Sequence, residues 1–296
     1  MNLCCCIFST YAAGLADRPV LLYFSAGAAS SVCPKTKKPS MPTILPASPT
    51  FLALAGLLGL ALGSFASCAV YRYVAELSML KPLRSFCPKC GASLAWWENI
   101  PILSFIILRG KCHHCKAPIS LRYPLIELLM AAWTAAVAWR YGFSAQWLAL
   151  TAFGLLFIVA SFIDFAIFIL PDLLTLPGAV LAFPVAVWVL GVSWEMSLLG
   201  AAIGAGLFWT IQILYRAIRK QEGLGLGDVK LMLLIGALTG AKALPLVITV
   251  GAFSGLAASV VYMLRPGANG LKTRIPFGPF LSLGAMLYLL FGRGLV

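Results

Sequence analysis

Four cysteines form two Cys-x-x-C pairs, Cys87 with Cys90 and Cys112 with Cys115, separated by 21 residues. Two such pairs place four thiolates where one tetrahedral ion can bind them all, and the spacing is close to that of zinc-ribbon sites. Four-sulfur coordination leaves no open position on the metal. We therefore predict a structural zinc ion that closes a small domain with little core of its own.

Other interpretations of the cysteine segment stay open. One Cys-x-x-C pair can be a redox motif, but its duplication and the absence of a βαβ pattern favour metal binding. His113 and His114 lie inside the second pair, where either can replace a cysteine as ligand or be an exposed spacer. Trp96, Trp97 and the apolar stretch 100–108, which is too short to span a bilayer, are expected to lay the segment on the membrane surface.

Two of the four aspartates, Asp164 and Asp228, lie inside or at the edge of long apolar stretches, where a charge is costly and indicates a function. We expect one water molecule between them. Two carboxyl groups that share a site cannot both ionise easily, so one stays protonated as an acid while the other acts as a base. This is the chemistry of an aspartic protease. The alternatives are that Asp228 caps a helix and that Asp164 makes a buried polar contact.

Three more charged residues lie near the apolar stretches. Asp172 opens one of them and is expected to be a helix N-cap, with a catalytic role held in reserve. Glu127 is expected to pair locally with Arg122. Lys230 follows the second aspartate by two residues, so it either tunes the charge of that carboxyl group or extends to the membrane interface.

These residues must be positioned by a chain of unusual composition. Its 296 residues are 61% hydrophobic and 10% charged, with a mean hydropathy of +0.96, which excludes an ordinary soluble domain and a disordered chain. A helix needs about 20 apolar residues to cross a bilayer. The candidate stretches lie near residues 50–70, 123–139, 147–170, 173–192, 196–215, 229–240, 243–264 and 277–292. We predict an all-α polytopic membrane protein of about eight transmembrane helices, with the cysteine module between the first two.

The basic residues orient these helices. Of the 22 Lys and Arg residues, 15 fall in the loops of one side, three fall in the opposite loops and four in the N-terminal tail. Because basic loops stay on the cytoplasmic side, the cysteine module and both aspartates are expected to face the cytoplasm. This bias accounts for most of the net charge of +13, so no nucleic-acid partner is needed.

The same patterns predict the domain organisation. Residues 1–40 are expected to be a disordered extension or a misassigned start, because their basic patch follows the weak apolar stretch, whereas in a signal peptide it precedes it. Residues 41–72 form the first transmembrane helix. Residues 73–122 form the cytoplasmic zinc module, and residues 123–296 form the membrane-embedded protease domain.

Two other classes of function compete with a protease. An ion-coupled secondary transporter also uses intramembrane aspartates and broken helices, but its halves are related by inverted repeats, and we find none in this sequence. A zinc-dependent membrane scaffold needs only the cysteine module. It leaves Asp164 and Asp228 without a purpose.

Several motifs in combination resemble the bacterial prepilin peptidases, the type IV leader peptidase family of polytopic GxGD-type aspartic proteases. The resemblance runs from about residue 51 to the end of the chain. The segments that carry it are residues 63–72, residues 85–127 with the four cysteines, Asp164 with residues 170–172, residues 225–230, and residues 276–280.

The resemblance implies a bifunctional enzyme of the bacterial inner membrane, with Asp164 and Asp228 as catalytic residues. Such an enzyme removes the basic leader from type IV prepilins and type II secretion pseudopilins at the cytoplasmic face. It then methylates the new N-terminal residue, with S-adenosylmethionine as methyl donor. The four cysteines resemble those of members with both activities, so methyl transfer is expected here as well.

Overall fold

The structure, a computed structural model, describes residues 48–79, 84–220, 225–263 and 275–292. The predicted N-terminal extension, residues 1–40, lies outside the described residues. Within them the chain is helical, and its β pairing is limited to two isolated antiparallel bridges in the cysteine module, Phe86 with Ser93 and Lys111 with Pro118. The all-α prediction is therefore confirmed for the described part of the chain.

A helix forms at each of the eight apolar stretches. These helices are α1 (Pro49–Val74), α3 (Arg122–Tyr141), α4 (Ala145–Ile167), α5 (Asp172–Pro184), α6 (Trp194–Arg219), α7 (Leu226–Thr239), α8 (Leu244–Met263) and α9 (Gly278–Phe291). The shorter elements are a 3-10 turn, η1 (Trp96–Asn99), the helix α2 (Leu103–Ile107), a π turn, η2 (Val185–Val189), and a second 3-10 turn, η3 (Ala241–Ala243).

Within the described residues, five segments are long and apolar enough to cross a membrane: α1, α4, α5 with η2, α6, and η3 with most of α8. Helix α9 is apolar but shorter, and α3 and α7 do not meet the same criteria. A multi-pass membrane protein is thus supported, while the predicted count of eight spans is not confirmed.

Local sequence signals fix where several of these helices begin. Ser48, Ser144 and Ser193 precede α1, α4 and α6, and the side-chain oxygen of each accepts a hydrogen bond from the backbone N–H three residues later. A serine at this position satisfies one of the N–H groups that a helix start leaves unpaired.

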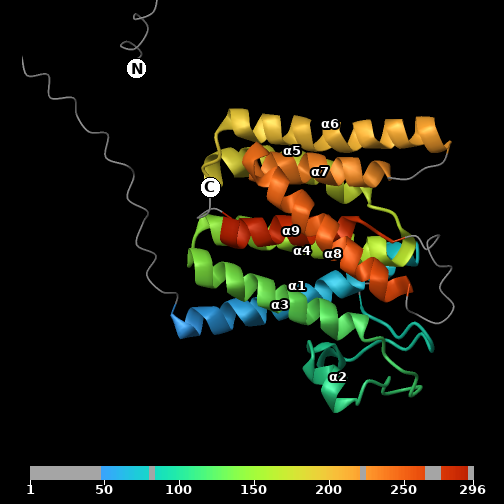
Figure 1. The fold of residues 1–296 in the computed structure, drawn as a ribbon. Helices are drawn as coiled ribbons and strands as arrows, with labels where there is room; N and C mark the ends of the chain where they lie inside the picture. Colours follow the sequence, from blue (N-terminus) through green and yellow to red (C-terminus); the bar gives the residue numbers. More distant parts are fainter. Residues whose placement is uncertain (1–47, 80–83, 221–224, 264–274, 293–296) are drawn as a thin grey trace, which may run out of the picture. The chain divides into compact units, whose positions relative to one another are not determined.

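The helices pack around a centre formed by α4, α7 and α9 (Figure 1). Helix α1 packs along α3, and both contact α4 on one side of the centre. On the other side α5 and α6 pack against α7, while α8 packs against α9. The cysteine module, which contains α2, follows the end of α1 and precedes the start of α3.

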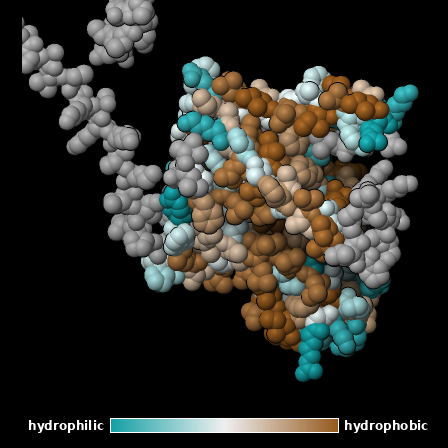
Figure 2. Space-filling view, viewed as in Figure 1, coloured by the Kyte–Doolittle hydropathy of each residue, from teal (hydrophilic) through white to brown (hydrophobic). Residues whose placement is uncertain are grey.

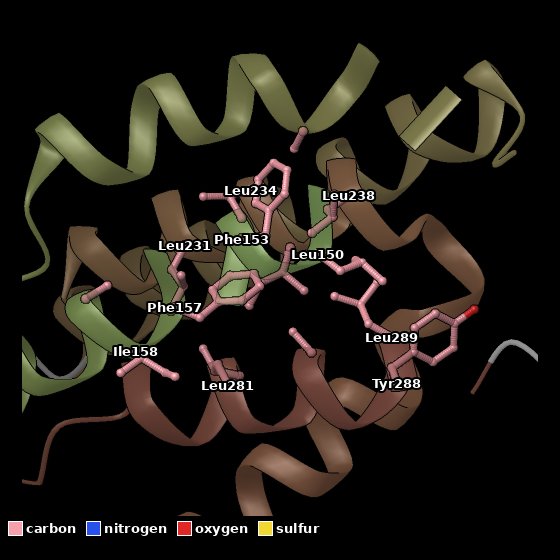
Figure 3. Packing of buried hydrophobic residues seen from close by; sticks show 14 of the residues in the cluster. Leu150, Phe153, Phe157, Ile158, Leu231, Leu234, Leu238, Leu281, Tyr288 and Leu289 are labelled. Carbon is pink, nitrogen blue, oxygen red and sulfur yellow. The ribbon is translucent and has the colours of Figure 1, made fainter. Parts of the chain in front are cut away.

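Helix α7 lies at the heart of the apolar core (Figure 3). Its Leu231, Leu234 and Leu238 are fully buried, among Phe153 and Phe157 of α4 and Leu281 and Leu289 of α9. A helix that is apolar on all sides is stable only where it is surrounded on all sides. Helix α7 is surrounded by protein, so its 14 residues do not have to match the thickness of the bilayer.

The outer surface is apolar over much of the face shown in Figure 2. Large apolar side chains are strongly exposed on several helices, among them Trp188, Phe253 and Ile218. Apolar surface of this extent is unfavourable in water and is what a helix presents to lipid. Together with the five long apolar segments, it indicates that the chain is embedded in a membrane.

Candidate active site and metal centre

Asp164 lies in the last turn of α4 and is buried, with 5% of its surface exposed. The helix ends at Ile167 because Phe168 adopts a left-handed conformation, and the N–H of Phe168 donates to the carbonyl oxygen of Asp164 at 2.9 Å. At 1.5 Å per residue, Asp164 is about 4.5 Å from the helix end. The helix ends three residues before residue 170, the predicted end of this apolar stretch.

Asp228 lies in the first turn of α7, and it too is buried. The N-cap position is held by Gly225, and no side chain caps this helix. The alternative interpretation of Asp228 as an N-cap is therefore wrong. Asp228 instead lies inside the first turn, three residues after the N-cap, where its buried carboxyl group interacts with the backbone of Gly225.

Three segments bring the two aspartates to one place. The N–H of Gly278, at the start of α9, donates to Oδ2 of Asp164 at 3.2 Å. Leu170 lies against this pair, and a Cβ atom added to Gly278 would stand 2.8 Å from Oδ2 and 3.2 Å from Leu170. Leu170 also packs closely against Gly227, where an added Cβ atom would stand 2.9 Å from the Cβ atom of Leu170. The ends of α4, α7 and α9 thus meet around one leucine.

The carboxyl groups of Asp164 and Asp228 interact electrostatically. They belong to two central helices and lie at the same end of the bundle. Two buried carboxyl groups in this relation can share one proton, so that one is an acid and the other a base. The two residues singled out in the sequence thus lie close enough to interact, and their catalytic role stays a prediction.

Sequence reasoning assigned no role to Gly278 or Leu170. A signal for Gly278 was present, because Gly278 is followed by Pro279, and proline is favoured in the first turn of a helix, where N–H groups are free to bind an acceptor. Leu170 carries no such signal.

Asp172 forms an ion pair with Lys230, with 2.6 Å between Oδ1 and Nζ. The N-cap of α5 is Pro171, and Asp172 is the first residue of the helix, so the expected capping role is wrong. The Asp172 side chain is 59% exposed, unlike the two buried aspartates. The pair links the starts of α5 and α7.

Glu127 connects α3 to the cysteine module. Its Oε2 accepts a hydrogen bond from the backbone N–H of Ile102 at 2.8 Å, and no ion pair with Arg122 is present among the described residues. The expected local partner is therefore wrong. Ile102 has a φ of +61°, a rare conformation for a β-branched residue, so this hydrogen bond holds a strained turn at the start of α2.

The four cysteines come together in the structure. Their Sγ atoms all lie within 4.8 Å of one another, and those of Cys87 and Cys115 are 3.9 Å apart. Zinc binds sulfur at about 2.3 Å, which places two sulfurs of a tetrahedron about 3.8 Å apart. The geometry and the donor set therefore fit a zinc ion, with Cys87, Cys90, Cys112 and Cys115 as its ligands.

The two halves of this cluster have the same local fold. In the first, the N–H of Cys87 donates to Ala92, and in the second the N–H of Cys112 donates to Ala117. The residue after each pair, Gly91 or Lys116, has a positive φ. Each half thus forms a tight turn that presents two sulfurs to a common centre.

The thiols of the first pair differ electrostatically. Burial alone would raise the pKa of the Cys87 thiol, but hydrogen bonds from the backbone at Cys90 and Lys89 and from neighbouring thiols outweigh it and lower the pKa to about 7. For Cys90, a backbone hydrogen bond at Ala92 acts to lower the pKa. Burial and the neighbouring thiols act in the opposite direction and outweigh it, so the pKa is raised to about 11. Cys87 is therefore the thiol of this pair that ionises more readily.

A cavity of about 290 Å³ lies between the cysteine module, α1 and α3. Its walls combine aromatic, charged and amide side chains, including Tyr71, Arg72, Asn99, Tyr123 and Glu127. Neither Asp164 nor Asp228 lines it. The pair of aspartates and this cavity are thus separate from each other.

Comparison with known proteins gives two family matches. Residues 57–141 match the bacterial peptidase A24 N-terminal domain, and this segment covers most of α1, the cysteine module and α3. Residues 151–260 match the type IV leader peptidase family, and this segment contains both buried aspartates.

Curated relatives agree with these matches. A prepilin leader peptidase/N-methyltransferase of Burkholderia pseudomallei is 40% identical over 267 residues, which cover 81% of this chain and 85% of the relative. Proteins of the same name from Pseudomonas putida and Pseudomonas aeruginosa are 35% and 36% identical, over 82% and 80% of this chain and 91% and 89% of the relatives. No solved structure shows a significant match.

Proposed function

The chain belongs to the type IV leader peptidase family, and from this premise we propose that it removes the basic leader from type IV prepilins and type II secretion pseudopilins. The observation that supports this most directly is the meeting of Asp164 and Asp228 at one end of the bundle, with the Gly278 N–H on Asp164. We propose these two aspartates as the catalytic residues. The comparisons do not favour the ion-coupled transporter considered above.

In the proposed reaction the ionised carboxylate takes a proton from a water molecule, whose oxygen attacks the carbonyl carbon of the scissile peptide bond. The protonated carboxyl group donates its proton to the carbonyl oxygen. When the C–N bond breaks, the leaving nitrogen receives a proton from the first carboxyl group. The Gly278 N–H holds one oxygen of Asp164, so it orients this carboxyl group toward the reacting bond.

We propose that this site faces the cytoplasm, in the inner membrane of a bacterium. Two features support this orientation: the concentration of basic residues in the loops of one side, and the place of both aspartates at helix ends of that side. A substrate with a basic leader in the cytosol and an apolar helix in the bilayer has its scissile bond at this interface.

We further propose that methylation of the new N-terminus takes place in the cavity beside the cysteine module. S-adenosylmethionine carries an aromatic base, a carboxylate and an ammonium group. The wall of the cavity offers Tyr71 and Tyr123 for the base, and Arg72 and Glu127 for the charges. When bound, this cofactor supplies the methyl group, and the zinc held by the cysteines is structural, keeping the cavity wall folded.

Cleavage of a prepilin in proteoliposomes by the Asp164→Asn, Asp228→Asn and Asp172→Asn variants tests the peptidase assignment. An amide keeps the size of the side chain but cannot exchange the proton. We expect the first two variants to be folded and inactive, and Asp172→Asn to retain cleavage. Full cleavage by Asp164→Asn and Asp228→Asn would contradict the assignment.

Methyl transfer is tested separately with an already cleaved pilin and labelled methyl donor. We expect Asn99→Ala and Tyr123→Leu to reduce methylation at least tenfold while cleavage stays within about twofold of wild type. Equal loss of both activities would contradict a separate methylation site.

A further inference from the structure

Glu98 is a buried carboxylate in the cysteine module that is only half paired. Its side chain is 1% exposed. Oε2 accepts a hydrogen bond from the backbone N–H of Ala95 at 2.7 Å, but Oε1 has no hydrogen-bond partner among the described residues. A buried charge is costly unless it is paired or coordinates a metal. This oxygen therefore needs a cationic partner.

Two histidines face this carboxylate. Nδ1 of His113 lies 3.6 Å from Oε1, and Nε2 of His114 lies 3.9 Å from Oε2. One ligand atom from each of the three residues lies within 4.8 Å of the others. Both histidine side chains are about half exposed, so ions from solution reach them.

The separations indicate what fits between these groups. They exceed the 2.7–3.2 Å of a direct N–H···O hydrogen bond. Nitrogen and oxygen ligands lie about 2.0–2.2 Å from zinc, so two of them on one tetrahedral ion are about 3.4 Å apart. The observed distances thus need only small movements of two half-exposed side chains to hold an ion.

The rings are already arranged around one point. Those of His113 and His114 are nearly perpendicular, with centroids 5.3 Å apart, and the ring of Trp97 packs edge-on against His113 at 5.4 Å. Neighbouring residues in a chain usually point apart, whereas here both rings turn toward the same carboxylate. This packing reduces the freedom that His113 loses when it binds an ion.

We propose that Glu98, His113 and His114 form a second metal site, separate from the four cysteines, for a divalent transition metal such as zinc. Two imidazoles and one carboxylate are ligands that zinc accepts, and three protein ligands leave one position open for water or another ligand. Glu98 and His113 also line the cavity described above, so the open position borders it. This inference does not depend on the proposed reactions.

Equilibrium dialysis of the full-length protein in detergent against Co²⁺, after metal removal, tests the proposal. Cobalt bound by thiolates gives an intense charge-transfer band, whereas cobalt bound by imidazole and carboxylate does not. We expect two ions per chain, only one of them with the thiolate band. One ion per chain would overturn the proposal.

Two variants and one control identify the ligands. We expect His113→Ala/His114→Ala to bind one ion and keep the thiolate band. Glu98→Gln keeps an acceptor for the Ala95 N–H but lacks the charge, and we expect it to bind the second ion at least 100-fold more weakly, since loss of even an outer partner costs about 10- to 100-fold. Lys116→Gly, at an exposed neighbouring position, should bind two ions. Unchanged affinity in Glu98→Gln would show adventitious binding to exposed histidines and would overturn the built site.

Discussion

Asp172 and Lys230 join the starts of α5 and α7 through an ion pair of 2.6 Å, two residues along α7 from the buried Asp228. Both side chains are partly exposed, 59% for Asp172 and 30% for Lys230. Exposed ion pairs contribute about 1 kcal/mol or less. Because the pair joins the starts of α5 and α7, we assign it a role in positioning α7.

The first prediction concerns this pair. Asp172→Asn, Lys230→Gln and the double variant should each retain cleavage within about fivefold of wild type, because less than about 1 kcal/mol is lost. Initial rates in proteoliposomes measure the effect. Expressed as a free energy of activation, the loss in the double variant should not exceed the sum of the losses in the two single variants. Complete loss of cleavage by folded Asp172→Asn would show that this carboxylate belongs to the catalytic machinery.

The second prediction concerns the Gly278 contact. An added Cβ atom would stand 2.8 Å from Oδ2 of Asp164, so Gly278→Ala must displace either the carboxyl group or the start of α9. Cleavage should fall by about 100-fold, the cost of a displacement of about 1 Å at a reacting group. The matched control is Gly206→Ala in α6, where an added Cβ meets no atom within 4 Å and activity should not change. Equal rates for both variants would disprove the contact.

The third prediction concerns metal removal. A strong chelator should make the segment from Cys87 to Cys115 sensitive to protease, because its two turns have little core beyond the sulfur cluster. Methylation should be lost and cleavage largely kept, since the two cysteine turns line the cavity, whereas neither aspartate does. Added zinc should restore protease resistance. If the metal-free protein kept its resistance to protease, a structural role of the metal would be excluded.

The fourth prediction concerns Glu127. Glu127→Ala leaves the N–H of Ile102 without its acceptor and should lower the free energy of unfolding of the module by about 1–3 kcal/mol. Glu127→Gln keeps an oxygen acceptor and should lose less than half as much. Hydrogen exchange at residues 100–108 measures the difference. The hydrogen bond has no stabilising role if the two variants behave alike.

The sequence was informative where a property depends on neighbouring residues. Apolar runs near 20 residues predicted the positions of the helices, and the duplicated Cys-x-x-C pair predicted that four sulfurs come together. Asp164 and Asp228 stood out because an aspartate in an apolar stretch is costly. Each of these signals is local, or repeats at a fixed spacing.

Contacts between distant segments were not predictable in this way. Gly278 and Asp164 are 114 residues apart, and Lys230 and Asp172 are 58 apart, so their contacts depend on how the helices pack. The expected pairing of Glu127 with Arg122 failed for the same reason. The Glu127 carboxylate instead accepts a hydrogen bond from Ile102, 25 residues away in the sequence. The end of α4 was misplaced because nothing in the sequence marks Phe168 as left-handed, a conformation usually taken by glycine.

Helices α6 and α7 contact each other through backbone atoms at Gly200 and Gly236. A Cβ atom added to Gly236 would stand 2.1 Å from the carbonyl oxygen of Gly200, and one added to Gly200 would stand 2.3 Å from that of Gly236. No side chain can rearrange at this crossing, so the two helices cannot slide past each other. In a thinner or thicker bilayer the hydrophobic mismatch must therefore be absorbed by tilting the two helices as a unit, and the depth of Asp228 relative to α6 stays fixed.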